Sequence, residues 1–246
     1  MYFDGNIDMG ISINPHHERA MFPVSSGLME TTLIRPPLTD LRIVGGNLAL
    51  DFVNTCAGPR HGPADTEWLS SYEDFAAWSR QAGVGHPSAA PSETAPRPAA
   101  IAALVRVQAC RDDMYEIFVA LGDGSAPPDP ALRRLHLAYI EALAQGQLTG
   151  GTEGCAWTWD PGSGLLAPLW PVVAAAVELL THGTTGSIKS CGACRFLFID
   201  HSKNGSRRWC SMDDCGKAAK IARYLQRRSD ARGQEESGAH GQQGTA

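Results

Sequence analysis

Four of the seven cysteines form two close pairs near the C-terminus, and their spacing constrains the fold of that region more than any other feature. Cys191 and Cys194 form a C-x2-C pair, and Cys210 and Cys215 form a C-x4-C pair after fifteen intervening residues. Two such pairs joined by a short loop are typical of sites in which four thiolates bind one zinc ion. The sequence therefore predicts one structural Zn²⁺ held by these four residues.

Other uses of this region fit its residues less well. A closed set of four thiolates leaves no position for a catalytic water, so we do not expect an enzyme at this metal. Asp200 and His201 lie between the pairs and are alternative ligands. A redox role for the first pair alone would leave the second pair unexplained. The remaining three cysteines stand singly among apolar residues and are expected to be buried thiols: Cys56, Cys110 and Cys155.

Charge is distributed unevenly along the chain. Residues 188–232 contain eleven Lys or Arg and four Asp or Glu, a net charge of about +7, whereas the remainder carries about −12. This polarity predicts an anionic partner for the C-terminal region. The residues that we expect to contact nucleic acid lie on a predicted hairpin and on the helix after it: Lys203, Arg207, Arg208, Lys217, Lys220, Arg223 and Arg227.

Residues 186–229 predict a small module that is zinc-ribbon-like or treble-clef-like. Residues 188–190 and 196–199 have the composition of strands, and Asn204-Gly205 predicts a hairpin turn after which residues 207–209 return as a second strand. A helix is expected from Cys215, with Ile221 and Tyr224 packed on the zinc module. So small a module has little core, and the metal is expected to contribute much of its stability. Residues 230–246 are predicted to be disordered.

The preceding residues, 41–183, predict a mainly helical domain with a few short strands, so the fold class is mainly α (α+β). Hydrophobic residues make up 43% of the chain, enough for a real core. Asn47 is expected to cap a short buried segment in which Asp51 and Asn54 fix a turn. A capping box starts a helix at Ser71. Periodicity predicts further helices at 99–121, 130–145 and 171–181 and a strand at 155–159, with a loose extension at 1–40 and a linker at 86–98.

The helical domain lacks the motifs of common enzyme classes. It has no phosphate loop, dinucleotide fingerprint or nucleophile–base pair at recognisable spacing. Asp51, Asn54 and His136 are too few to define an active site. No segment has the pattern of a secretion signal, and the apolar stretch 165–180 is too short for a membrane span and contains prolines and Glu178. With seven cysteines and no such signal, the chain is predicted to be cytoplasmic, with no membrane partner.

The finger also has a family pattern. After C-x-x-C comes Phe198-x-Asp200-x-Ser202-x-Asn204-x-x-Arg207-Arg208-Trp209-Cys210-Ser211-Met212-x-x-Cys215-Gly216, which resembles the CGNR zinc-finger family. Upstream, Leu50-Asp51-Phe52-Val53-Asn54-Thr55 is similar to the start of the ABATE domain, which precedes this finger in many bacterial proteins. The resemblance implies a stress-induced transcriptional regulator whose zinc-dependent C-terminus binds DNA.

The chain departs from that family at two positions. The name motif reads Cys-Gly-Asn-Arg, and here it reads Cys215-Gly216-Lys217-Ala218. A lysine at 217 cannot reproduce the bidentate contact of an arginine with phosphate. The resemblance therefore implies that zinc binding persists while DNA affinity or specificity is altered.

The leading hypothesis is a cytoplasmic DNA-binding regulator with no catalytic activity. The alternative is a zinc finger that docks an acidic protein partner, or one that binds RNA. The sequence also leaves open a homodimer and an unidentified small-molecule effector bound by the N-terminal domain.

Overall fold

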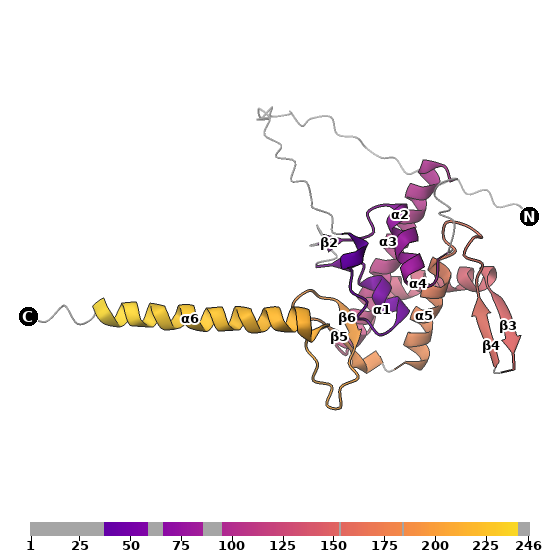
Figure 1. The fold of residues 1–246 in the computed structure, drawn as a ribbon. Coiled ribbons are helices and arrows are strands. Elements are labelled where there is room, and N and C mark those ends of the chain that lie inside the picture. The colour runs from indigo at the N-terminus through magenta and orange to yellow at the C-terminus, as the bar shows by residue number, and fades with distance from the viewer. Residues whose placement is uncertain (1–36, 59–65, 86–94, 153, 184, 241–246) are drawn as a thin grey trace, which may run out of the picture. The chain divides into compact units, whose positions relative to one another are not determined.

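The computed structural model describes residues 37–58, 66–85, 95–152, 154–183 and 185–240, with side chains up to residue 230 (Figure 1). Most of the predicted N-terminal extension and of the predicted linker at 86–98 lies outside the described residues. Contacts within residues 35–246 define one compact unit. Among the described helices, none combines the length and apolar character that crossing a bilayer requires.

The fold is mainly helical, as the sequence predicted. After a 3-10 turn at Leu38–Asp40, α1 (Leu48–Val53) starts where the Asn47 side chain accepts a hydrogen bond from the N–H of Ala49. The predicted capping box between Ser71 and Asp74 is present at the start of the next helix. The remaining helices of this part are α2 (Tyr72–Gln81), α3 (Arg97–Gly122), α4 (Asp129–Gln145) and α5 (Leu169–His182).

The core is centred on α1, which contacts α3 and α5. A six-residue helix is unstable in isolation, so α1 depends on packing for its stability. Leu50 and Phe52 are fully buried, and the Phe52 ring lies 5.2 Å from that of Trp78 between centroids. Burial of each such side chain stabilises the fold by about 1.5–3 kcal/mol. The same core continues into the C-terminal module through Ile188 and Phe198.

The described strands form three two-stranded antiparallel sheets. The strands are β1 (Cys56–Ala57) with β2 (Thr66–Glu67), β3 (Gln147–Gly151) with β4 (Gly154–Thr158), and β5 (Ile188–Ser190) with β6 (Leu197–Ile199). β3 was not predicted, because two glycines and few apolar residues give it no strand signal.

The predicted hairpin across Asn204-Gly205 is wrong. β6 pairs with the preceding strand β5, with Ile188 opposite Ile199, and residues 207–209 form no strand. Gly205 does occupy a turn, with a φ of 56°. The Asp200 carboxylate, however, accepts hydrogen bonds from backbone N–H groups on both sides of that turn. The two ends of the turn are therefore held by a side chain and not by hydrogen bonds between two strands.

The C-terminal helix, α6 (Lys217–His240), extends beyond the predicted boundary at residue 230. Residues 231–236 include Ala, Arg, Gln and Glu, which have favourable helix propensities. The prediction of disorder from residue 230 gave these propensities too little weight. Ile221 is 51% exposed and Tyr224 is 59% exposed. The prediction that these two residues pack on the zinc module is therefore wrong.

Candidate metal centre and nucleic-acid interface

The four predicted ligands come together at one point. The Sγ atoms of Cys191, Cys194, Cys210 and Cys215 all lie within 4.8 Å of one another, and no other such cluster occurs among the described residues. The Sγ of Cys194 is 3.5 Å from that of Cys210 and 3.7 Å from that of Cys215. A tetrahedral ion with Zn–S bonds of about 2.3 Å requires sulfurs about 3.8 Å apart. The site therefore fits one zinc ion with a complete set of four protein ligands.

The first cysteine pair is shaped by a tight backbone turn. The N–H of Cys191 donates to the carbonyl of Phe196 at 2.8 Å, and the N–H of Arg195 donates back to the carbonyl of Cys191 at 3.1 Å. Arg195 has a φ of 60°, a left-handed conformation that costs a non-glycine residue about 1–2 kcal/mol. This turn directs both thiolates of the pair to the same side.

The second pair is held by a capped helical turn. The Ser211 hydroxyl accepts from the N–H of Asp214, and Cys215 lies in the π-helical turn Met212–Gly216 that leads into α6. The Trp209 ring lies close to both pairs. A Cβ added to Gly192 would lie 3.0 Å from this ring, and one added to Gly216 would lie 3.3 Å from it. Close approach to the ring explains the glycine at 192, and the Met212 side chain, 3.0 Å away, together with the ring explains the glycine at 216.

The alternative ligands do not join the metal site. Asp200 is buried, accepts from the backbone N–H groups of Ser202 and Arg207, and lies 3.3 Å from the Nζ of Lys189. Hydrogen bonds from Ser202, and then from Arg207 and Lys189, hold the pKa of the Asp200 carboxyl well below its usual range. His201 is exposed and lies outside the cysteine cluster.

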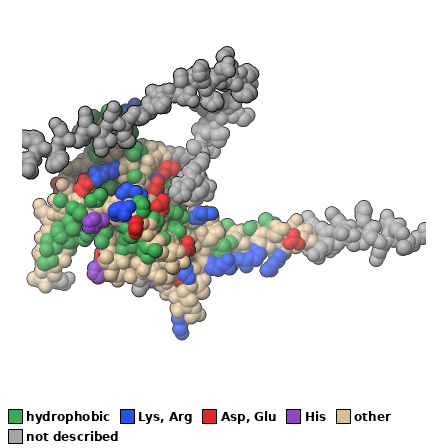
Figure 2. All heavy atoms as spheres, turned by 180° about the vertical axis from the view of Figure 1, so that it is seen from behind, with side chains coloured by type: hydrophobic (Ala, Val, Ile, Leu, Met, Phe, Trp, Pro, Cys, Tyr) green, Lys and Arg blue, Asp and Glu red, His purple; other side chains and the backbone are tan. Residues whose placement is uncertain are grey.

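Six of the seven basic residues predicted to contact nucleic acid are exposed. Lys203 and Arg208 lie on the loop before Cys210. The others lie on α6, where helical spacing puts Lys220, Arg223 and Arg227 on one face. Figure 2 shows Lys and Arg side chains gathered along one edge of α6 and hydrophobic side chains along the other. This edge is a continuous positive surface that begins at the zinc site.

Arg207 is used inside the finger. It is half-buried, and its guanidinium lies 4.3 Å above the Phe198 ring. Its Nε donates to the carbonyl of Trp209 at 2.9 Å, and the same guanidinium donates to the carbonyl of Cys210. Arg207 therefore fixes the backbone that leads into the second cysteine pair.

Asp51 and Asn54, predicted to fix a turn, connect α1 to neighbouring segments. The Asp51 carboxylate accepts from the backbone N–H of Gly45, and burial raises the pKa of this carboxyl while hydrogen bonds from Gly45 and Val44 oppose the rise. Asn54 does more than was predicted: its amide donates to the carbonyl of Leu197 at 2.9 Å and accepts from the Leu197 N–H at 2.8 Å. A helical-domain side chain thus continues the hydrogen bonding of β6.

Arg42 reaches the metal site from upstream of α1, and no sequence signal pointed to it. Its guanidinium lies 3.7 Å from the Sγ atoms of both Cys194 and Cys215 and 3.3 Å from the Asp214 carboxylate. Burial alone would lower the pKa of this guanidinium, but the hydrogen bond to Cys215 and the charges of the cysteines raise it overall. A pattern search for a cation near the finger could not find a residue so distant in sequence.

The remaining candidates lie away from the metal. His136 is exposed on α4. Cys56 is buried and Cys110 is partly buried, whereas Cys155 is exposed, so the prediction of a buried thiol is wrong for Cys155.

Two family models match the chain. Residues 46–183 match ABATE, described as "Putative stress-induced transcription regulator", and residues 187–228 match the CGNR zinc finger. No curated protein matches the chain. Arg42 lies before both matched ranges.

Proposed function

The chain belongs to the ABATE family and carries a CGNR zinc finger, and on this premise we propose that it is a cytoplasmic regulator of transcription in a stress response that binds DNA through the finger. The observation that supports DNA as the partner is the basic edge of α6 next to a closed zinc site. Four protein ligands suit a structural metal, so the proposed role is binding rather than catalysis.

The dimensions of α6 suit a duplex. Lys220 and Arg227 are seven residues apart, about 10 Å along a helix that rises 1.5 Å per residue. DNA carries one phosphate per about 1.7 Å of axis, so this edge spans several phosphates. A single helix also fits the width of the major groove. Lys203 and Arg208 on the preceding loop extend the positive surface.

Salt-dependent binding tests the proposal. We expect the zinc-loaded chain to bind fluorescent genomic DNA fragments in an anisotropy titration, with an affinity that falls steeply between 50 and 200 mM salt. The triple variant Lys220→Gln, Arg223→Gln, Arg227→Gln should lose affinity across all sequences and reduce the slope of log K against log salt by about 2–3.

The matched control removes three exposed arginines from the helical domain: Arg80, Arg97 and Arg133. It changes the net charge equally, so it separates local contacts from overall charge. DNA binding that is absent in the zinc-loaded chain, or lost equally in both triple variants, would refute the proposal. If the zinc-loaded chain binds DNA as expected, selection of bound DNA from a random pool would identify the preferred site.

A second candidate function is docking of a protein or RNA partner. Three exposed residues lie beside the basic edge of α6: Ile221, Tyr224 and Leu225. A surface that is apolar on one side and basic on the other suits a macromolecular partner with both apolar and acidic groups. Binding of single-stranded RNA or recovery of a protein partner, with no effect of added duplex DNA, would favour this function over the first. A homodimer stays a prediction, to be tested by sedimentation.

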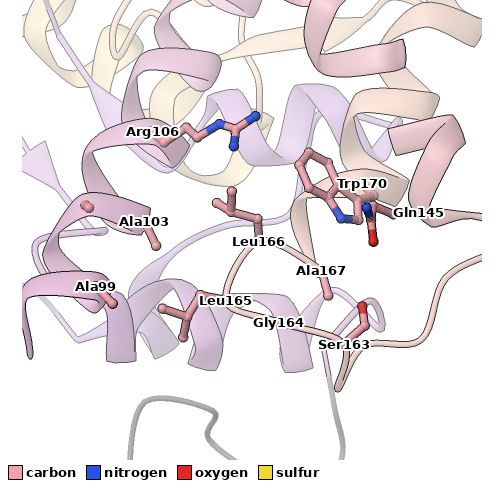
Figure 3. Close-up of a pocket in the computed structure, with 11 residues that line it drawn as sticks. Ala99, Ala103, Arg106, Gln145, Ser163, Gly164, Leu165, Leu166, Ala167 and Trp170 are labelled. Atoms are coloured by element: carbon pink, nitrogen blue, oxygen red, sulfur yellow. The ribbon is translucent and has the colours of Figure 1, made fainter. Parts of the chain in front are cut away.

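For the effector we propose a pocket of about 520 Å³ in the helical domain (Figure 3). Its walls are apolar at Ala103, Leu165 and Trp170, and Arg106, Gln145 and Ser163 supply polar groups. This volume and lining suit a small flat organic acid. Benzoate at millimolar concentration should raise the melting temperature of the chain and of Arg80→Gln, but not of Ala102→Phe, which fills the pocket from an exposed position. No shift in the unsubstituted chain would remove the support for this ligand class.

A further inference from the structure

Arg42 makes a contact with the metal site that the finger motif does not encode. Its two terminal nitrogens lie 3.7 Å from the Sγ of Cys215, and one of them lies 3.7 Å from the Sγ of Cys194. The guanidinium also lies 5.4 Å from the centroid of the Phe196 ring. These contacts join residues separated by 152 and 173 positions in the chain.

The charge of the site gives this contact a role. Four thiolates and one Zn²⁺ carry a formal charge of −2, and the Arg42 side chain, 30% exposed, places a positive charge in contact with two of these thiolates. Donation of N–H groups to a thiolate withdraws electron density from the lone pairs that attack electrophiles. Residues that hydrogen-bond to metal ligands commonly change metal affinity by about 10- to 100-fold when they are replaced.

The guanidinium is held in position by the helical domain. The Asp51 carboxylate fixes Gly45 through a 2.8 Å hydrogen bond, and the carbonyl of Gly45 accepts from the N–H of Ile199 in β6 at 3.0 Å. The segment that carries Arg42 is therefore anchored on one side to α1 and on the other to the finger. The Asp214 carboxylate of the finger pairs with the same guanidinium at 3.3 Å.

We propose that Arg42 completes the zinc centre from outside the finger, so that it retains the metal and shields the Cys194 and Cys215 thiolates from electrophiles. In this arrangement, the helical domain controls how firmly the finger holds its zinc. Displacement of the segment around Gly45 would weaken zinc retention without any change in the four ligands. The inference rests on the zinc site and does not depend on DNA binding.

Zinc transfer to the chelator 4-(2-pyridylazo)resorcinol tests the proposal in the full-length, zinc-loaded chain. Arg42→Gln should release zinc about 10- to 100-fold faster than the unsubstituted chain. Arg42→Lys keeps the charge but has a single ammonium in place of the planar fork, so its rate should be at least about threefold faster than that of the unsubstituted chain and slower than that of the Gln variant. Far-ultraviolet circular dichroism of the loaded proteins establishes that each is folded.

The matched control is Arg228→Gln, which removes an exposed positive charge on α6, thirteen residues beyond the last ligand, and should leave the rate within about twofold. Alkylation by iodoacetamide, in which a thiolate sulfur bonds to carbon and iodide leaves, gives an independent readout. Mass spectrometry should find faster labelling of Cys194 and Cys215 in Arg42→Gln. Transfer and labelling rates equal to those of the unsubstituted chain would overturn the proposal. If the Gln variant does not fold, an unchanged rate in Arg42→Lys decides against it.

Discussion

Arg207 illustrates how one basic side chain in a positive region can serve the fold rather than a ligand. It combines a ring contact with Phe198 and hydrogen bonds to the carbonyls of Trp209 and Cys210. A cation over a ring contributes about 0.5–2 kcal/mol, and hydrogen bonds from a charged group about 1.5–3 kcal/mol. These contacts predict a structural phenotype for its replacement.

We expect Arg207→Gln to lower the free energy of unfolding of the zinc-loaded chain by about 3 kcal/mol, measured by urea denaturation. The neighbouring Arg208→Gln should cost at most about 1 kcal/mol, because Arg208 is exposed and loses only a contact with the Trp209 ring, 5.8 Å from its guanidinium. A DNA-binding defect of an Arg207 variant is therefore interpretable only after its stability is known. Equal stabilities for the two variants would show that Arg207 does not brace the finger.

Ala218 is one of the two residues at which this chain departs from the family motif, and it is exposed on the first turn of α6. An arginine there would face solvent on the same end of the helix as Lys217. We predict that Ala218→Arg strengthens DNA binding and steepens the salt slope by about 0.9, the effect of one added phosphate contact. Anisotropy titrations at four salt concentrations would measure this. Ala218→Gln is the control, and an equal gain in both variants would exclude a charge effect.

At the scale of elements, β6 belongs to both parts of the chain. One of its edges pairs with β5, and the amide of Asn54 bonds to the backbone of Leu197. Asn54 is fully buried, so its loss would leave a buried N–H and a buried C=O without partners. Each such group costs about 1–3 kcal/mol.

Asn54→Ala should therefore lower the free energy of unfolding by about 4 kcal/mol. Asn47→Ala removes only the cap of α1 and should cost about 1 kcal/mol, so it is the comparison for loss of a single local hydrogen bond. Chemical denaturation monitored by circular dichroism measures both. Similar costs for the two variants would mean that the contact between Asn54 and β6 contributes little.

Local signals in the sequence predicted local structure well. Asn47 and the Ser71 capping box act within a few residues, the four cysteines lie within 25 residues, and the structure confirms all three signals. The bonding of Asn54 and the contact of Arg42 depend on residues more than a hundred positions away, which no periodicity encodes. Asn204-Gly205 gave a genuine turn signal, but the buried Asp200 determined what the turn connects.

For the whole molecule, the helical domain and the finger share one core, so the stability of both is expected to depend on the metal. The Trp68 ring of the helical domain meets the Phe196 ring of the finger edge-on, with centroids 5.8 Å apart. Gly122, at the end of α3, packs closely against the backbone of Ile188 in β5. A Cβ added to Gly122 would lie 2.8 Å from the carbonyl oxygen of Ile188. Loss of zinc should therefore loosen contacts in the helical domain as well as in the finger.

We predict that removal of zinc by a chelator lowers the melting temperature of the helical signal at 222 nm and changes the near-ultraviolet signal of tryptophan. Cys210→Ser should reproduce the effect with no chelator, because it removes one ligand of the site. Cys155→Ser, which replaces an exposed thiol, should not. An unchanged helical transition after complete zinc loss would contradict the coupling of the two parts.

The order of synthesis determines when the bond between Asn54 and Leu197 can form. Its partners are 143 residues apart, and ribosomes add about 5–20 residues per second. Asn54 therefore leaves the ribosome about 7–30 seconds before the strand that it bonds to. Throughout that interval the Asn54 amide lacks the strand to which it bonds, which leaves a polar and apolar face open to chaperones until β6 emerges.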